Sequence, residues 1–239
     1  MRTLVLQHIA CEPPGYYEDV LLDAGAVIHR VEVDEGDPLP DWREFAVIVA
    51  MGGPMSVNDE DEFPWLAQEK RLIADAVRGG TPFWGACLGV QLLAASLGGR
   101  VHAGPEPEVG LLPVTLTPEA LADPVFAGFP PELLTLQWHG DTFELPPGAV
   151  RLAGSAAYPN QAFRHGERAY GVQFHLEVTP AMAKEWAQVP EYGEYLDRTL
   201  GSGAFPVLLD SLERHVELLG DSARRIFSQW LERVVPAGA

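Results

Sequence analysis

Lysine is nearly absent from this chain, which has only Lys70 and Lys184 among its 239 residues. All basic residues together number 16 against 34 Asp and Glu, so the formal net charge is -18. A protein this acidic repels phosphate backbones and anionic lipid surfaces on average. We therefore exclude nucleic-acid and membrane-surface binding as the main function. Solubility, a salty habitat or a basic partner surface could each account for the acidity.

Cysteine is scarce too, and long apolar runs are missing. Cys11 and Cys87 are too few for a disulfide framework, and their sequence contexts differ. No window approaches the length of a membrane span, and residues 1–10 carry no signal-peptide cleavage pattern. These absences predict a cytoplasmic protein in a reducing compartment.

Sequence motifs typical of metal-binding or nucleotide-binding sites are also missing. Isolated histidines stand at positions 8, 29, 102, 165 and 215, without H-E-x-x-H or C-x-x-C spacing. No G-x-G-x-x-G follows the first predicted strand, and there is no P-loop. We predict no metal and no cofactor.

What the sequence does contain is the composition of an ordinary folded domain. Hydrophobic residues make up 47% and charged residues 21%, which rules out a disordered or fibrous chain. A length of 239 residues fits one α/β domain. We predict a single domain over residues 1–239.

The first part of the chain has the rhythm of a β-α-β unit. Residues 3–7, 26–33 and 46–51 are expected to be strands, with a helix over 16–24. The run AVIVAM at 46–51 has no polar alternation, which is typical of a parallel strand buried on both faces. The sequence therefore predicts a three-layer α/β fold, with a mostly parallel sheet and helices on both faces.

Further elements follow the same logic. A helix is expected from Pro64 to the Gly79-Gly80 pair, then a strand at 81–84 and an uncharged, buried helix at 88–97. Five short strands should extend the sheet, at 111–116, 133–138, 150–153, 161–164 and 169–174. Residues 205–235 are expected to form a C-terminal helical extension packed on the domain, as two amphipathic helices split near Gly220-Asp221.

Cys87 stands where a predicted strand turns directly into a helix, flanked by small residues in Gly85-Ala86-Cys87-Leu88-Gly89. This is the pattern of a nucleophile elbow, which lifts the side chain above the sheet edge. The positive helix N-terminus favours a thiolate, and the N–H of Leu88 is free to stabilise an oxyanion. An inert cysteine that only fills space is about equally compatible with this segment alone.

A base and an orienting carboxylate follow a later strand. His175 and Glu177 are two residues apart, so at strand spacing both side chains point to one face. His175 could take the thiol proton while Glu177 holds the imidazole. Without Cys87, a hydrogen-bonded surface pair would be the better interpretation.

The loop after the buried strand at 46–51 is a second candidate for substrate contact. Gly52 and Gly53 let backbone N–H groups approach a substrate closely, at the sheet edge where α/β proteins bind ligands. Gly53 is thus a second oxyanion-donor candidate, although Gly-Gly-Pro is also a common turn.

These segments together resemble the class I glutamine amidotransferases. GACLGVQ at 85–91 has their G-x-C-x-G-x-Q elbow, and QFHLE at 173–177 is similar to their F-H-x-E segment. With MGGPMS at 51–56 and QWHGD at 137–141, the resemblance covers about residues 1–180. It is strongest to stand-alone proteins akin to the glutaminase domain of GMP synthase, and it implies a flavodoxin-like fold.

The resemblance implies a mechanism. Cys87 would attack the γ-carbonyl of glutamine, with the N–H groups of Gly53 and Leu88 as the oxyanion hole, and ammonia would leave before water hydrolyses a γ-glutamyl thioester. Residues in contact with the substrate would be Gly52, Gln91, Gly140 and Asp141, the last two at its α-carboxylate or α-amino end.

Two departures and two alternatives accompany this hypothesis. Leu176 and Val90 differ from residues frequent in the family, but neither position supplies catalytic chemistry. No synthetase-like segment is present, so a separate synthetase subunit is expected to carry any ammonia acceptor.

One alternative is a γ-glutamyl hydrolase or peptidase, which would use the same triad on γ-glutamyl peptides or amines. The other is a catalytically silent binding module.

Overall fold

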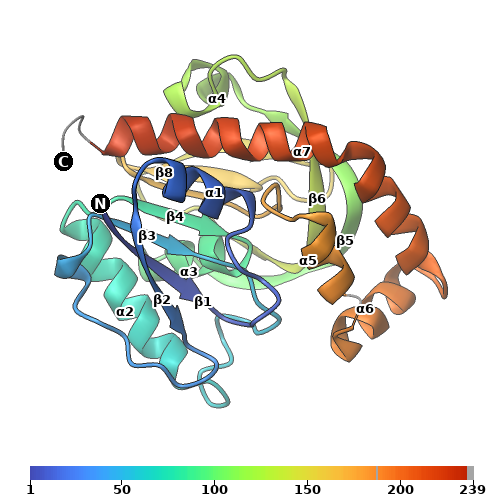
Figure 1. Ribbon diagram of the computed structural model, residues 1–239, viewed down its shortest axis with the longest axis horizontal. Helices are drawn as coiled ribbons and strands as arrows, with labels where there is room; N and C mark the ends of the chain where they lie inside the picture. The colour runs from blue at the N-terminus through green and yellow to red at the C-terminus, as the bar shows by residue number, and fades with distance from the viewer. Residues whose placement is uncertain (187, 236–239) are drawn as a thin grey trace.

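The computed structural model describes residues 1–186 and 188–235, and its centre is a nine-stranded mixed sheet (Figure 1). The strands are β1 Arg2–Gln7, β2 Val27–Glu32, β3 Val47–Ala50, β4 Phe83–Ala86, β5 Val101–Leu116, β6 Glu132–Phe143, β7 Ala149–Gly154, β8 Ala162–His165 and β9 Ala169–Val172. Their order across the sheet is β2-β1-β3-β4-β9-β8-β7-β5-β6. The first five strands in this order are parallel to their neighbours, and the pairings from β9 to β6 are antiparallel.

Helices cover both faces of the sheet. They are α1 Tyr16–Asp23, α2 Trp65–Arg78, α3 Leu88–Ser96, α4 Pro118–Ala122, α5 Pro180–Trp186, α6 Pro190–Leu200 and α7 Ala204–Val234, with short 3-10 turns at Trp42–Glu44 and Pro124–Phe126. One hydrophobic core joins α1 and α7 to the sheet, and a second core joins α2 and α3 to the opposite face. The expected α/β class with helices on both faces is confirmed, in the form of a mixed sheet.

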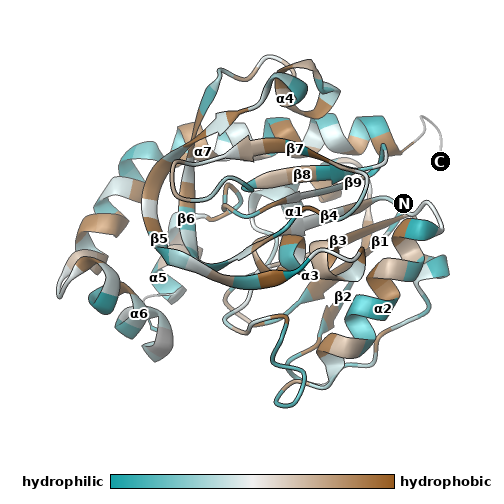
Figure 2. Cartoon of the chain, turned by 180° about the vertical axis from the view of Figure 1, so that it is seen from behind, coloured by the Kyte–Doolittle hydropathy of each residue, from teal (hydrophilic) through white to brown (hydrophobic). Residues whose placement is uncertain are grey.

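The strands and helices obey the patterns that predicted them. Every residue of β3 is buried, as its continuous apolar run requires, because helices lie on both sides of it. Helix α2 has a hydrophobic side facing the sheet and a hydrophilic side facing outward (Figure 2). In the described residues, no helix is long and apolar enough to cross a lipid bilayer.

The C-terminal segment corrects one prediction, because α7 is one continuous helix of 31 residues and not two. A glycine inside a helix costs only about 1 kcal/mol relative to alanine, so Gly220 does not have to end it. A Cβ at Gly220 would lie 3.1 Å from the Tyr16 ring, so the glycine gives α1 room to pack closely. Farther along α7, Phe227 stacks on Tyr17 at 4.7 Å between ring centroids.

Two short helices before α7 were not predicted. Both α5 and α6 begin with a proline, Pro180 and Pro190, which fits the first helical turn because no N–H is needed there. Trp186 of α5 and Tyr192 of α6 are buried against the core. These helices border the cavity described next.

Candidate active site

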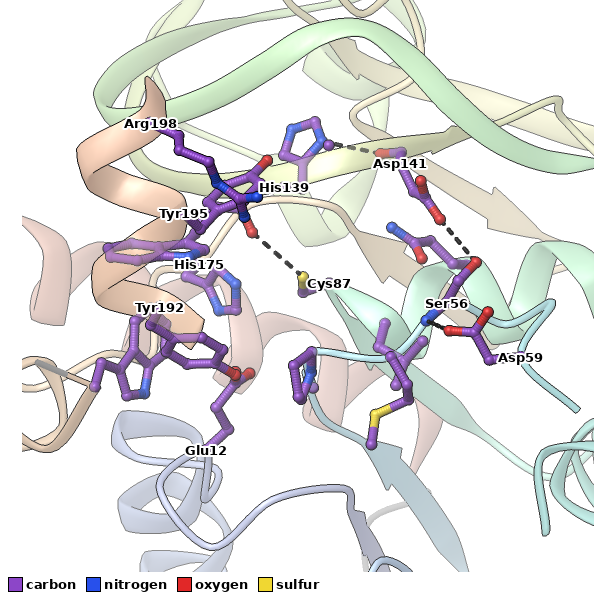
Figure 3. Close-up of a pocket in the computed structure, with 18 residues that line it drawn as sticks. Glu12, Ser56, Asp59, Cys87, His139, Asp141, His175, Tyr192, Tyr195 and Arg198 are labelled. Carbon is purple, nitrogen blue, oxygen red and sulfur yellow. Dashed lines mark hydrogen bonds between the residues drawn. The ribbon is translucent and has the colours of Figure 1, made fainter. Parts of the chain in front are cut away.

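A cavity of about 390 Å³ opens at the carboxyl ends of the parallel strands β3 and β4, where α/β sheets bind their ligands. Of the residues singled out from the sequence, the cavity is lined by Gly53, Cys87, Leu88, Gln91, Gly140, Asp141 and His175. Two others stand behind this lining. Glu177 lies behind His175, and Gly52 is buried next to Gly53 without lining the cavity. Figure 3 shows Cys87 between His175 on one side and Ser56 and Asp141 on the other.

Cys87 sits in a strained turn. Its φ angle is 53°, and within the described chain it is the one non-glycine residue with positive φ. Such a backbone costs of order 1–3 kcal/mol and persists where the surroundings enforce it. The enforcement is steric: a Cβ on Gly89 would lie 2.1 Å from the carbonyl oxygen of Ala50, so only glycine lets α3 start this close to β3. The elbow pattern in the sequence thus corresponds to an elbow in the fold.

Cys87 is buried, with 7% of the residue exposed, and its sulfur lies next to polar groups. The side-chain amide of Gln173 donates to the sulfur at 3.7 Å, and the carbonyl oxygen of Trp138 lies 4.0 Å from it. Cys11, the second cysteine, lies outside the cavity lining. Burial raises the pKa of the Cys11 thiol to about 12, which leaves it unreactive at neutral pH.

His175 and Glu177 form a buried pair. Nδ1 of His175 lies 2.7 Å from a Glu177 carboxylate oxygen, and each side chain is 2% exposed. The other carboxylate oxygen accepts from the N–H of Leu176 at 3.0 Å, which fixes the carboxylate. Burial lowers the pKa of His175, but Glu177 and the sulfur of Cys87 outweigh it and raise that pKa well above its ordinary value. This arrangement favours an imidazolium beside the sulfur.

A second buried pair lies behind the glycine loop. His8 and Glu69 are both fully buried, and Nε2 of His8 lies 2.9 Å from a Glu69 oxygen. Nδ1 of His8 lies 3.2 Å from the carbonyl oxygen of Gly52 and must donate to it, since a carbonyl only accepts. Burial lowers the pKa of His8, but Glu69 and the Gly52 carbonyl bring it above its ordinary value. The peptide after Gly52 is trans, so the N–H of Gly53 points away from His8.

Glu12 is a cavity residue that the sequence reasoning missed. It is 6% exposed, and one of its carboxylate oxygens accepts a hydrogen bond from the hydroxyl of Tyr192. A Cβ on Gly52 would lie 1.9 Å from the other oxygen, Oε2, and 3.2 Å from Cε1 of His175. The carboxylate of Glu12 and the imidazole of His175 therefore lie next to each other, on the same side of Gly52. The position of Glu12 just after the first parallel strand was the available signal, because ligand sites gather there.

The opposite end of the cavity is acidic. The carboxylate of Asp141 accepts from the Ser56 hydroxyl at 2.8 Å, and the carboxylate of Asp59 accepts from the Ser56 N–H at 2.8 Å. Gln91 reaches the cavity from α3, and its side-chain N–H group donates to Gln173 at 3.1 Å. These groups offer hydrogen-bond acceptors and negative charge to a ligand amine.

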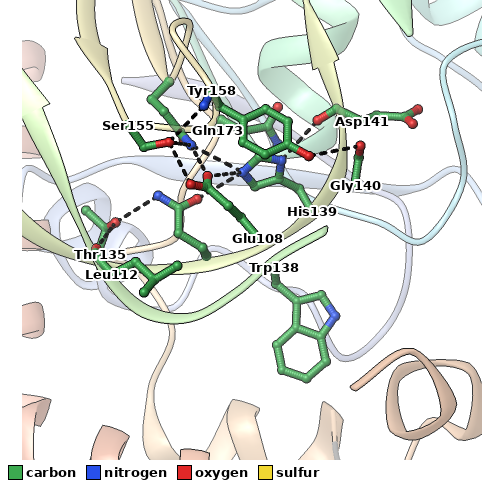
Figure 4. A network of polar contacts seen from close by, with 12 residues as sticks. Glu108, Leu112, Thr135, Trp138, His139, Gly140, Asp141, Ser155, Tyr158 and Gln173 are labelled. Atoms are coloured by element: carbon green, nitrogen blue, oxygen red, sulfur yellow. Dashed lines mark hydrogen bonds and ion pairs between the residues drawn. The ribbon is translucent and has the colours of Figure 1, made fainter. Parts of the chain in front are cut away.

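A network of polar contacts holds the Gly140-Asp141 segment of β6 (Figure 4). His139 contacts the backbone carbonyl of Asp141 at 3.0 Å through Nδ1, and its Nε2 lies 3.3 Å from Glu108. Tyr158 stacks edge-on against His139 at 4.7 Å, and its hydroxyl lies 3.5 Å from the Gly140 carbonyl. His139 therefore holds the backbone of this segment through its contact with the Asp141 carbonyl.

Helix α6 adds the residues that were hardest to foresee. Tyr192, Tyr195 and Arg198 are spaced by three residues, so they share one helix face, and all three line the cavity. Burial raises the pKa of Tyr195 to about 12. In the described chain, no three His, Cys, Asp or Glu side chains converge as metal ligands would.

Comparison with known proteins shows which family the chain is similar to. The family model for glutamine amidotransferase class-I matches residues 19–186. The glutamine amidotransferase-like protein YfeJ of Salmonella typhimurium is 36% identical over 183 residues, covering 75% of this chain and 77% of YfeJ. The glutamine-hydrolysing GMP synthase subunit of Sulfolobus acidocaldarius is 32% identical over 154 residues, covering 63% of this chain and 77% of its own length. The crystal structure of a glutamine amidotransferase from Thermotoga maritima superimposes with a TM-score of 0.87 at 32% identity, covering 97% of this chain and 98% of the other.

Proposed function

The chain belongs to the class-I glutamine amidotransferase family, and from that premise we propose that it hydrolyses the γ-amide of glutamine through a thioester on Cys87. The observation that carries the proposal is one cavity that holds a sulfur on a strained elbow beside a buried His175–Glu177 pair. A cysteine that only fills space needs neither the positive φ nor the charged neighbour.

The proposed reaction begins with the proton of the Cys87 thiol on His175. The thiolate attacks the γ-carbonyl carbon, and the N–H groups of Gly53 and Leu88 donate to the oxygen as it becomes negative. Support for Gly53 comes from His8, which holds the preceding carbonyl and so turns this N–H away from the buried pair. His175 then protonates the nitrogen, ammonia leaves, and water hydrolyses the γ-glutamyl thioester.

The substrate's amino-acid end is proposed to lie at the acidic side of the cavity. The carboxylate of Asp141 would pair with the α-ammonium group, a charge-assisted bond worth about 1.5–3 kcal/mol. Gly140 and Gln91 would complete this contact, Gly140 through its backbone and Gln91 through its side-chain amide. Gly52 would act indirectly, through the peptide that it shares with Gly53.

The fate of the ammonia separates two functions. Similarity to the Sulfolobus GMP synthase protein supports an amidotransferase that passes ammonia to a separate synthetase partner. The second candidate is a γ-glutamyl hydrolase, supported by the cavity's extension along Tyr192, Tyr195 and Arg198, beyond the residues that match the family model. This side could hold a leaving group larger than ammonia.

Two free cysteines fit a reducing compartment such as the cytoplasm.

The test compares the purified wild-type chain with the Cys87→Ser variant in the hydrolysis of glutamine and of a panel of γ-glutamyl peptides and amines. Release of ammonia or amine should require Cys87, and Cys11→Ser should leave the rates unchanged as the matched control. Strong turnover of glutamine alone would count against the hydrolase. A Cys87→Ser variant that keeps the wild-type rate would remove the proposed mechanism, and failure of iodoacetamide to label Cys87 would favour the silent module.

A further inference from the structure

Glu12 is a second carboxylate beside His175, in addition to Glu177, and it lies outside residues 19–186 that match the family model. We propose that Glu12 accepts a hydrogen bond from the departing nitrogen and stabilises its positive charge. Glu12 would thereby make the site selective for amides over esters. The inference rests on the proposed thioester mechanism and adds a catalytic residue to it.

The position of Glu12 follows from packing around Gly52. Because Oε2 of Glu12 and Cε1 of His175 approach the same face of Gly52, the carboxylate stands next to the imidazole edge. In Figure 3, Glu12 and Tyr192 lie on the His175 side of the cavity, away from Ser56 and Asp141. The nitrogen that His175 protonates must lie within hydrogen-bond reach of the imidazole. Glu12 is therefore placed on the side from which the leaving group departs.

The two oxygens of Glu12 have different surroundings. Oε1 accepts from the Tyr192 hydroxyl, which anchors the carboxylate to α6. Oε2 faces the Gly52 backbone and the cavity, where it can accept from a ligand. Burial raises the pKa of Glu12 above its ordinary value, and the positive charge of His175 and the Tyr192 hydroxyl offset only part of this rise. An ammonium-like nitrogen beside Oε2 would lower the pKa again and favour the ionised carboxylate at that step.

A carboxylate at this place is useful at one step of the proposed reaction, the departure of the nitrogen. In the tetrahedral intermediate, His175 transfers its proton to the nitrogen, which becomes positively charged and still carries N–H donors. The C–N bond then breaks, its electron pair stays with the nitrogen, the C=O bond re-forms, and a neutral amine leaves. A carboxylate beside that nitrogen stabilises the charge as it develops. An ester oxygen has no N–H donor and leaves through a developing negative charge, so the same carboxylate gives it no help.

The experiment compares kcat/KM for glutamine and for glutamate γ-methyl ester in wild type and Glu12→Gln. This parameter reports only steps up to departure of the leaving group, so the shared thioester hydrolysis does not mask the difference. We expect amide turnover to fall about 10- to 100-fold, the range of one charge-assisted hydrogen bond, and ester turnover to fall less than about 3-fold. Glu35→Gln, which changes an exposed carboxylate, is the matched control and should leave both rates unchanged.

A second measurement separates this role from simple support of the imidazolium. Alkylation of Cys87 by iodoacetamide involves no leaving nitrogen, so Glu12→Gln should reach the wild-type plateau rate of alkylation, which also shows that the site is folded. Because the charges of Glu12 and His175 interact, the midpoint of the pH profile is expected to shift while the plateau stays unchanged. Equal losses on amide and ester, or a lowered plateau rate of alkylation, would overturn the inference and leave the proposed hydrolysis intact. Wild-type protein that cleaves neither substrate would instead remove the proposed function itself.

Discussion

Gly89→Ala is the substitution that tests most sharply how the elbow holds Cys87. The new methyl group would lie 2.1 Å from the carbonyl oxygen and 2.8 Å from the carbonyl carbon of Ala50. Both are backbone atoms of a fully buried strand, so neither can rotate away as a side chain would. The start of α3 must move instead, and with it Leu88, whose N–H is one of the two proposed oxyanion donors.

The size of the effect follows from those distances. Relief of the contact requires a displacement of about 1 Å, and a misplacement of about 1 Å at a catalytic group costs roughly 100-fold in rate. Overpacking of a dense core costs about 1–3 kcal/mol of unfolding free energy. For a chain of this size that corresponds to a melting temperature lower by roughly 2–12 °C. We therefore expect a folded protein that has lost most of its activity.

The assay is steady-state glutamine hydrolysis at a temperature well below the melting transition of the variant. Gly193→Ala is the matched control, because a Cβ there meets nothing within 4 Å and α6 tolerates alanine. The control should keep full activity and gain slightly in stability, by about 0.4–1 kcal/mol. Wild-type kcat in Gly89→Ala, at unchanged stability, would refute the claim that the close approach of α3 to β3 sets the catalytic geometry.

Three further predictions concern charged groups. Glu177→Gln should lower kcat about 10²- to 10⁴-fold, because the imidazole loses its orienting carboxylate. Since that carboxylate raises the pKa of His175, the alkaline limb of the pH–rate profile should move to lower pH, and an unmoved limb would argue against the pairing. Glu69→Gln should lower the unfolding free energy by about 3 kcal/mol near pH 6, as expected for a broken buried pair. The pKa of His8 is raised in the folded protein, so the protonated imidazole stabilises the fold fully at a pH below its unfolded pKa, and this stabilisation is lost as pH rises through the folded pKa. The difference in unfolding free energy between Glu69→Gln and wild type should therefore shrink in denaturant titrations at increasing pH. A difference that grows with pH would contradict the assignment. Asp141→Asn should raise KM for glutamine about 10-fold with kcat little changed, since its contact is to the non-reacting end of the substrate, and an unchanged KM would place the α-ammonium elsewhere.

Local patterns were sufficient where one segment determines its own geometry. The small residues around Cys87 predict the elbow because a strand can turn this sharply into a helix only where glycine permits close packing. The spacing of His175 and Glu177 similarly predicts a pair on one face. The apolar run of β3 predicts a strand covered on both sides.

Contacts between distant segments could not be predicted in this way. Glu12 meets Tyr192, 180 positions away, and His8 meets Glu69 across 61 positions. Neither pair has a sequence spacing to reveal it, because tertiary packing alone brings the partners together. The continuous helix α7 shows the opposite error: Gly220 looked like a break, yet packing against α1 outweighs the small cost of glycine inside a helix.

The central claim is that glutamine hydrolysis passes through a covalent bond to one sulfur. Rapid acid quenching of the chain during turnover, followed by peptide mass analysis, tests it directly. We predict that the peptide containing Cys87 gains the mass of one γ-glutamyl group, that the adduct is absent without glutamine, and that Cys87→Ala neither forms it nor releases ammonia. Ammonia release at the wild-type rate by Cys87→Ala would contradict the account.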